Sequence, residues 1–175
     1  MISTRLKEII RDVPDFPKPG IIFKDITPIL LDPQLTRDII DEMVNHVKSL
    51  NLDAIVGIES RGFLFGFPLA QKLGVPFVLI RKKGKLPAET HQVTYDLEYG
   101  SATLEIHKDA LCMNDKILIH DDLLATGGTA CATAKLVELC GASVAGFSSL
   151  IELSFLNGNE EIAKFTKNII NLARY

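Results

Sequence analysis

The sequence has little of several features that mark specialised protein classes. It has only three cysteines, Cys112, Cys131 and Cys140, an odd number without regular spacing. Such cysteines predict free thiols in a reducing compartment, and for Cys131 a small buried residue rather than a reactive one. No apolar run approaches the roughly 20 residues that span a bilayer, and residues 1–12 lack the apolar core of a signal peptide. We therefore expect a cytoplasmic protein that makes no use of a membrane.

An excess of positive charge is also missing. The chain has 19 Lys and Arg against 22 Asp and Glu, a net charge of −3. This balance argues against a general nucleic-acid or anionic-membrane surface. The spacing of His and Cys fits no metal-ligand cluster, and no Ser-His-Asp arrangement is suggested. We expect neither a metal held by the protein nor a hydroxyl nucleophile.

Apolar segments of strand and helix type alternate along the 175 residues, without repeats or a linker. This alternation predicts one α/β domain over residues 1–175, with a central, mostly parallel sheet flanked by helices. Thr36 is predicted to cap an amphipathic helix that follows it, and Ser3 to cap a helix over 3–12. Further strands are predicted at 54–58, 77–80, 117–119 and 143–151, and further helices at 63–73, 130–140 and 160–165, before a short tail. Residues 93–99 and 102–106 read as a hairpin inserted between parallel strands, which we interpret as a lid over roughly 84–106.

The most informative stretch is residues 116–133, KILIHDDLLATGGTACAT. A buried strand leads to the acid pair Asp121 and Asp122, then to small residues and glycines over 125–129, then to a helix. Backbone N–H groups of such a turn and the helix N-terminus favour a phosphate. The spacing fits neither a Walker A loop nor G-x-G-x-x-G. Because carboxylates repel phosphate but accept hydrogen bonds from vicinal hydroxyls, the implied ligand is a ribose 5-phosphate.

Polar residues follow two other predicted strands. Residues 59–62, ESRG, come after one, and residues 81–85, RKKGK, come after another. In an open α/β sheet such turns share one edge, so Arg61 is predicted to share a crevice with the acid pair. The basic run fits either a pyrophosphate site or a solvated surface. Residues 21–28 read as a strand-like piece, or as an apolar plug under the first helix.

Residues 116–133 resemble the phosphoribosyl pyrophosphate (PRPP) motif of type I phosphoribosyltransferases, and nearly the whole chain is similar to the adenine phosphoribosyltransferases. The supporting pieces are PDFPKPG at 14–20, FKDITP at 23–28, ESRGF at 59–63, RKKGKLP at 81–87, LEYG at 97–100 and Glu152-Leu153. The resemblance implies the type I fold with a small hood, formed by elements in 1–30 and 152–175, and a flexible hairpin lid. It also implies the reaction adenine + PRPP → AMP + pyrophosphate, with Mg²⁺ carried by PRPP or pyrophosphate, in a homodimer. No nucleic acid is expected as a partner.

The resemblance also assigns site residues. It implies catalytic roles for Glu98, as acid or base, and for Arg61, Asp121 and Asp122. It implies PRPP binding by Ser60, Arg61, Arg81, Lys85, Asp121, Asp122, Ala125, Thr126, Gly127, Gly128 and Thr129. Adenine would contact Ile22, Phe23, Lys24, Leu153 and Tyr99. A cis peptide is expected between Glu59 and Ser60.

Two further positions bear on the choice of purine base and on the acid pair. The similar 6-oxopurine enzymes carry Asp at the position of Ala125, so alanine here favours adenine, with Glu98 supplying the acid. His120 stands where related motifs have an apolar residue. We interpret it as a hydrogen-bonded core histidine, which leaves open whether its protonation tunes Asp121. Two alternatives remain, a transferase for 6-oxopurines and a regulator that binds PRPP without consuming it.

Overall fold

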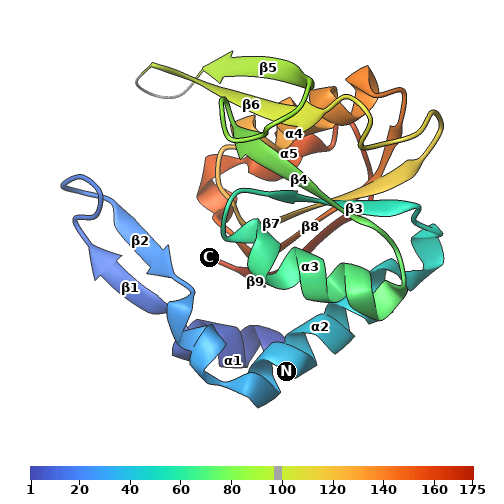
Figure 1. Cartoon of the computed structure of the whole chain (residues 1–175). Coiled ribbons are helices and arrows are strands. Elements are labelled where there is room, and N and C mark those ends of the chain that lie inside the picture. Colours follow the sequence, from blue (N-terminus) through green and yellow to red (C-terminus); the bar gives the residue numbers. More distant parts are fainter. Residues whose placement is uncertain (97–99) are drawn as a thin grey trace.

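A mostly parallel sheet forms the centre of the molecule (Figure 1). The computed structural model describes residues 1–96 and 100–175, and within them seven strands join in the order β5-β6-β4-β3-β7-β8-β9. Strands β4, β3, β7, β8 and β9 are parallel, whereas β6 pairs antiparallel with both β4 and β5. Their bounds are β3 Ala54–Ile58, β4 Phe77–Lys82, β5 Thr90–Asp96, β6 Ser101–His107, β7 Lys116–Leu124, β8 Ser143–Glu152 and β9 Ile169–Arg174. The predicted fold class is confirmed.

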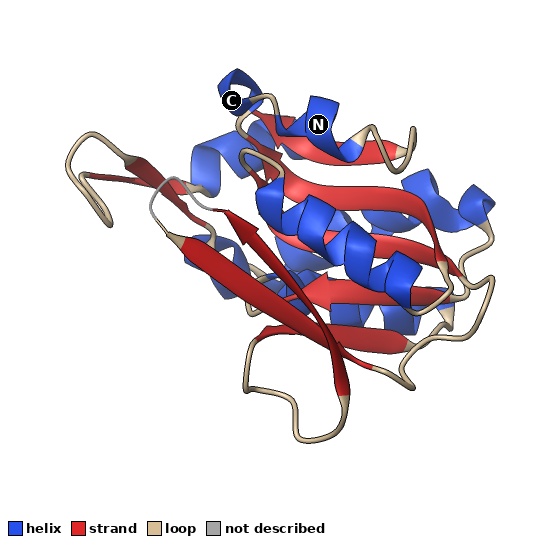
Figure 2. Ribbon diagram, turned by 90° about the horizontal axis from the view of Figure 1, so that it is seen from above, coloured by secondary structure: helices blue, strands red, loops and turns tan. Residues whose placement is uncertain are grey.

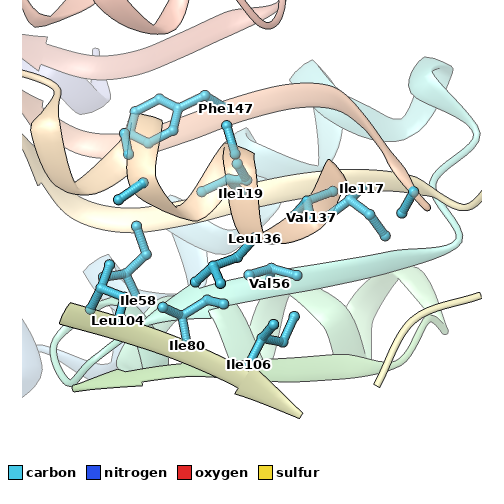
Figure 3. Packing of buried hydrophobic residues seen from close by; sticks show 14 of the residues in the cluster. Val56, Ile58, Ile80, Leu104, Ile106, Ile117, Ile119, Leu136, Val137 and Phe147 are labelled. Carbon is cyan, nitrogen blue, oxygen red and sulfur yellow. The ribbon is translucent and has the colours of Figure 1, made fainter. Parts of the chain in front are cut away.

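Helices cover both faces of this sheet (Figure 1). Helices α1 (Ile2–Ile9), α2 (Pro33–Val47) and α3 (Gly62–Leu73) lie on one face, and α4 (Gly128–Leu139) and α5 (Gly158–Ile162) on the other. Each face has its own apolar cluster, and Figure 3 shows the one beneath α4. Because side chains alternate along a strand, Ile119 of β7 packs beneath α4 while the adjacent Leu118 packs toward α3. A strand buried on both sides explains the continuous apolar run in the sequence.

Two antiparallel β-structures extend beyond the parallel strands. One is the antiparallel pair of β1 (Arg11–Pro14) and β2 (Ile22–Asp25), and the other is the β5–β6 hairpin. Both project on the same side in the views of Figures 1 and 2. The parallel strands β3 and β7 lead there into α3 and α4. Polar residues at these strand ends are therefore brought together at one edge.

Two helix boundaries differ from the predicted ones. Helix α2 begins at Pro33, and the side chain of Asp32 accepts hydrogen bonds from the backbone N–H groups of Gln34 (3.0 Å) and Leu35 (2.9 Å). The prediction that Thr36 is the cap was wrong, because proline is already well suited to the first helical position. Ser3 lies inside α1 rather than capping it. That helix ends at Ile9 because residues 11–14 pair with β2.

The C-terminal segment also differs. The predicted helix over 160–165 is a short helix, Gly158–Ile162, and the predicted tail is strand β9, parallel to β8. An asparagine in the middle of β9 obscures its strand pattern. Asn171 is retained there because it bonds Ser149 on β8 (2.8 Å) and the Glu152 carboxylate (2.9 Å). A polar residue in an edge strand is stable when its hydrogen bonds are satisfied in this way.

Candidate active site

A cavity of about 490 Å³ opens at the edge where the polar strand ends meet. Its described lining comes from the turn after β3, the last residue of β4, the hairpin, and the end of β7 with the following loop. The lining residues are Ile58, Glu59, Ser60, Arg61, Lys82, Tyr95, Leu104, Asp121, Asp122, Leu123, Leu124, Ala125, Thr126, Gly127, Gly128, Thr129 and Ala130. The predicted shared crevice is present.

Residues 125–129 form the loop that begins helix α4, and we call them the phosphate loop. Gly127 precedes the helix with φ +87°, a left-handed conformation that favours glycine. Gly158, the first residue of α5, supports the loop from outside the cavity. A Cβ on Gly158 would lie 2.2 Å from the carbonyl oxygen of Ala125. The loop therefore has a tightly fixed backbone at a helix N-terminus, where an anion is stabilised by free N–H groups and the helix dipole.

The two acids lie inside strand β7, a few residues before the phosphate loop. The backbone N–H of Asp122 donates to Oδ1 of Asp121 at 2.8 Å. Burial, together with the neighbouring Asp122 carboxylate, raises the pKa of Asp121. The Arg61 guanidinium Nε lies 2.7 Å from Oδ2 of Asp122. This ion pair lacks hydrogen-bond geometry, so Oδ2 has no hydrogen-bond partner among the described residues. Oδ2 of Asp122 therefore keeps its capacity to accept a hydrogen bond from a ligand hydroxyl.

Comparison with known proteins shows the family to which this chain belongs. The family model for the phosphoribosyl transferase domain matches residues 27–170. The chain belongs to the phosphoribosyltransferase family. Adenine phosphoribosyltransferase from Synechococcus sp. is 55% identical over 170 residues, which cover 97% of this chain and 98% of that protein.

Solved structures agree with this assignment to the phosphoribosyltransferases. Adenine phosphoribosyltransferase from Thermoanaerobacter pseudethanolicus is 48% identical, with a TM-score of 0.95 over the whole of both chains. The Trypanosoma brucei adenine phosphoribosyltransferase was solved in complex with AMP, pyrophosphate and ribose-5-phosphate. It is 28% identical, with a TM-score of 0.90, and the match covers 99% of this chain and 79% of that one.

The phosphoribosyltransferase structure brings several predicted residues together and separates others. Ser60, Arg61, the acid pair and the phosphate loop all line the cavity, and the Glu59–Ser60 peptide is cis, as expected. Among the described lining residues, Lys82 is present but Arg81 and Lys85 are not. Arg81 Nε instead donates to Oε2 of Glu59 at 3.2 Å.

The described residues predicted to contact adenine are not among those that line this cavity. On β2, Phe23 lies beneath the Arg61 guanidinium, whose carbon is 4.9 Å from the ring centroid. Ile22 is largely exposed, and Lys24 Nζ donates to Asp12 at 2.6 Å.

Leu153 is the remaining predicted adenine contact among the described residues. The backbone N–H of Leu153 donates to the carbonyl oxygen of Leu124, a cavity residue, at 2.9 Å. Leu153 is thus held beside the cavity by the end of β7. Glu98 and Tyr99 lie outside the described residues.

His120 precedes the acid pair and is fully buried. Its Nδ1 lies 2.9 Å from the Ser148 hydroxyl, and burial lowers its pKa to about 3. The interpretation as a hydrogen-bonded core histidine is confirmed. Because the ring stays neutral across ordinary pH, its charge does not tune Asp121. Cys131 is only half-buried, and burial raises its thiol pKa, which lowers its reactivity.

Two residues that shape the site, Glu105 and Tyr95, were not predicted, and Lys82 was predicted only as part of the basic run 81–85. Lys82 follows buried Ile80 by two positions, so strand alternation was a usable signal for its orientation. The buried Glu105 carboxylate on β6 accepts the N–H groups of Lys85 and Leu86, each at 2.9 Å, and so holds the basic segment. Tyr95 places its hydroxyl 3.0 Å from Thr129 Oγ1. For Glu105 and Tyr95 no sequence signal was available, because both contacts join distant segments.

Proposed function

We propose that this protein transfers the 5-phosphoribosyl group of PRPP to adenine, giving AMP and pyrophosphate in purine salvage. The observation that carries the proposal is the acid pair beside the phosphate loop in one cavity. Near full-length identity of 55% to an adenine phosphoribosyltransferase supports the choice of base. The ligands of the Trypanosoma brucei relative are the proposed products and a fragment of PRPP.

The sequence of the phosphate loop also favours adenine. An acid at its first position would suit the N7 of a 6-oxopurine, and Ala125 has no group that could exchange a proton. The predicted acid or base is Glu98. We expect Glu98→Gln to lower kcat more than it weakens PRPP binding, because the amide keeps the size of the side chain but cannot transfer a proton. Steady-state kinetics would measure both effects. Equal losses in kcat and in PRPP binding would exclude a role in proton transfer.

The proposed function implies a place for each part of PRPP. The 5-phosphate occupies the phosphate loop, and Asp121 and Asp122 accept hydrogen bonds from the ribose hydroxyls. Arg61 and Lys82 line the cavity and would attract a departing pyrophosphate, and Arg81 and Lys85 extend the basic region. As the C1 bond to pyrophosphate breaks, positive charge develops on the ribose and negative charge on the leaving group. Fixed groups of opposite sign lower the energy of that transition state.

Magnesium enters this proposal as part of the substrate. Among the described residues, no three His, Cys, Asp or Glu side chains gather as a resident metal would need. A diphosphate supplies the oxygen ligands that Mg²⁺ prefers, and Mg²⁺ commonly binds proteins through substrate phosphates. Its contribution when bound is to neutralise charge on the leaving pyrophosphate.

We also propose a homodimer and a cytoplasmic location. Leu64 and Phe67 on α3 and Leu79 on β4 are large apolar residues exposed by 42%, 52% and 39%. A second copy covering this surface would remove it from water. The three cysteines, all among the described residues, are free thiols, which suits a reducing compartment. No helix within the described residues is long and apolar enough to cross a bilayer.

The decisive test is pyrophosphate release in the presence of PRPP, Mg²⁺ and one base at a time. Release with adenine alone is the expected result. Release with hypoxanthine or guanine would keep the PRPP site and overturn the choice of base. PRPP binding without release on any base would favour the regulator instead.

A further inference from the structure

Tyr95 links the β5–β6 hairpin to the phosphate loop. Its hydroxyl lies 3.0 Å from Oγ1 of Thr129, the second residue of α4. Its ring lies over Gly128, where an added Cβ would be 3.5 Å from the ring atom Cδ2. The side chain is half-buried and packs against the apolar cluster beneath α4. One residue of the hairpin thus contacts two of the five phosphate-loop residues.

The direction of this hydrogen bond matters for anion binding. Each hydroxyl has one proton to donate and can also accept. If Thr129 donates to Tyr95, its proton is not available to a phosphate. If Tyr95 donates to Thr129, the threonine proton is free to point into the loop. The phenol is the more acidic hydroxyl, with an ordinary pKa of about 10, and is therefore the better donor.

A bound phosphate reinforces the second arrangement. A hydrogen bond to a charged phosphate oxygen is roughly twice as strong as one between neutral groups. The anion therefore attracts the Thr129 proton, and Oγ1 becomes a better acceptor for Tyr95. Hydrogen bonds in such a chain strengthen one another. The expected order is Tyr95 to Thr129 to phosphate.

We propose that Tyr95 is a positioning residue of the phosphate subsite, which acts by donating to Thr129 so that the threonine hydroxyl is directed at the 5-phosphate. The proposal rests on the proposed function, because it assumes that the phosphate loop holds the 5-phosphate of PRPP. The ligand class is a sugar phosphate monoester. The base subsite is not involved.

Tyr95→Phe tests the proposal because it removes the hydroxyl and keeps the ring over Gly128. Loss of one hydrogen bond between neutral groups predicts a rise of about fivefold in the KM for PRPP. The KM for adenine and kcat should stay within about twofold. Binding of ribose 5-phosphate, followed by calorimetry without turnover, should weaken by the same factor. Thr94→Val is the matched control, since it removes a hydroxyl that bonds Thr103 (2.8 Å) on the other face of the hairpin.

A double-mutant cycle separates positioning from a general structural effect. In a Thr129→Val background, Tyr95→Phe should cause no further loss, because the group through which it acts is gone. Equal losses in both backgrounds would overturn the proposal, as would a Tyr95→Phe variant that binds ribose 5-phosphate like the wild type. A wild-type protein that binds no ribose 5-phosphate would overturn the proposed function and this inference together. If the wild type is active and Tyr95→Phe has the same KM for PRPP and the same affinity for ribose 5-phosphate, only the inference is overturned.

Discussion

The contact between α5 and the phosphate loop leads to a prediction for Gly158→Ala. The new Cβ would lie 2.2 Å from the carbonyl oxygen of Ala125 and 3.1 Å from the backbone nitrogen of Gly127. Favourable carbon–oxygen contacts lie at about 3.3–3.6 Å, so the two segments must separate by about 1 Å. Both partners are backbone, and no side-chain rotation relieves the clash.

Displacing the phosphate loop by this amount should affect catalysis more than folding. A misplacement of about 1 Å can cost about 100-fold in rate, so we expect kcat/KM for PRPP to fall by about that factor. Overpacking of this kind costs about 1–3 kcal/mol, and each kcal/mol lowers the Tm of a chain this size by roughly 2–4 °C. Kinetics and thermal unfolding measure the two effects, with Glu160→Ala on the exposed side of α5 as control. Wild-type kcat/KM in Gly158→Ala would show that the contact with α5 does not fix the position of the phosphate loop.

Three further predictions concern carboxylates. Asp122→Asn should leave the far-UV circular dichroism intact but sharply lower turnover with PRPP, and unchanged kinetics would exclude the ribose-hydroxyl role. Asp121→Asn should raise Tm at pH 8: the pKa of Asp121 is raised in the folded state, so its ionisation reduces stability as pH rises above about 4. A Tm at pH 8 equal to that of the wild type would contradict this prediction. Glu105→Leu removes the oxygen that accepts the backbone N–H groups of Lys85 and Leu86, so inhibition by pyrophosphate should weaken while AMP binding persists, and exposed Glu89→Leu is the control.

The sequence was sufficient for features that depend on local patterns. The apolar run of β7, the acids after it and the glycines of the phosphate loop have their predicted order, and the cavity unites them. The same logic failed where a partner far along the chain decides the structure. Strand β9 exists because β8 offers an edge and because Asn171 finds partners there. Thr36 lies inside α2 rather than capping it, because Asp32 and Pro33 form the start of the helix.

The functional contacts beyond the motif show the same limit. Tyr95 and Thr129 are 34 residues apart, and Glu105 is about 20 residues from the backbone it holds. Alternation along a strand can indicate which face a residue occupies, but not which segment crosses that face. A motif therefore locates the chemistry, while the tertiary structure decides which side chains support it.

Arg61 is in contact with both halves of the proposed site. Its guanidinium forms an ion pair with Asp122, on the ribose side, and lies over the Phe23 ring, on the base side. A purine stacked on that face of Phe23 would displace the cation, and so would a pyrophosphate that attracts it. Occupation of one subsite therefore changes the free energy of filling the other, and this coupling is equal in both directions. If the proposed function holds, Arg61 would thus couple the binding of the two substrates before they react.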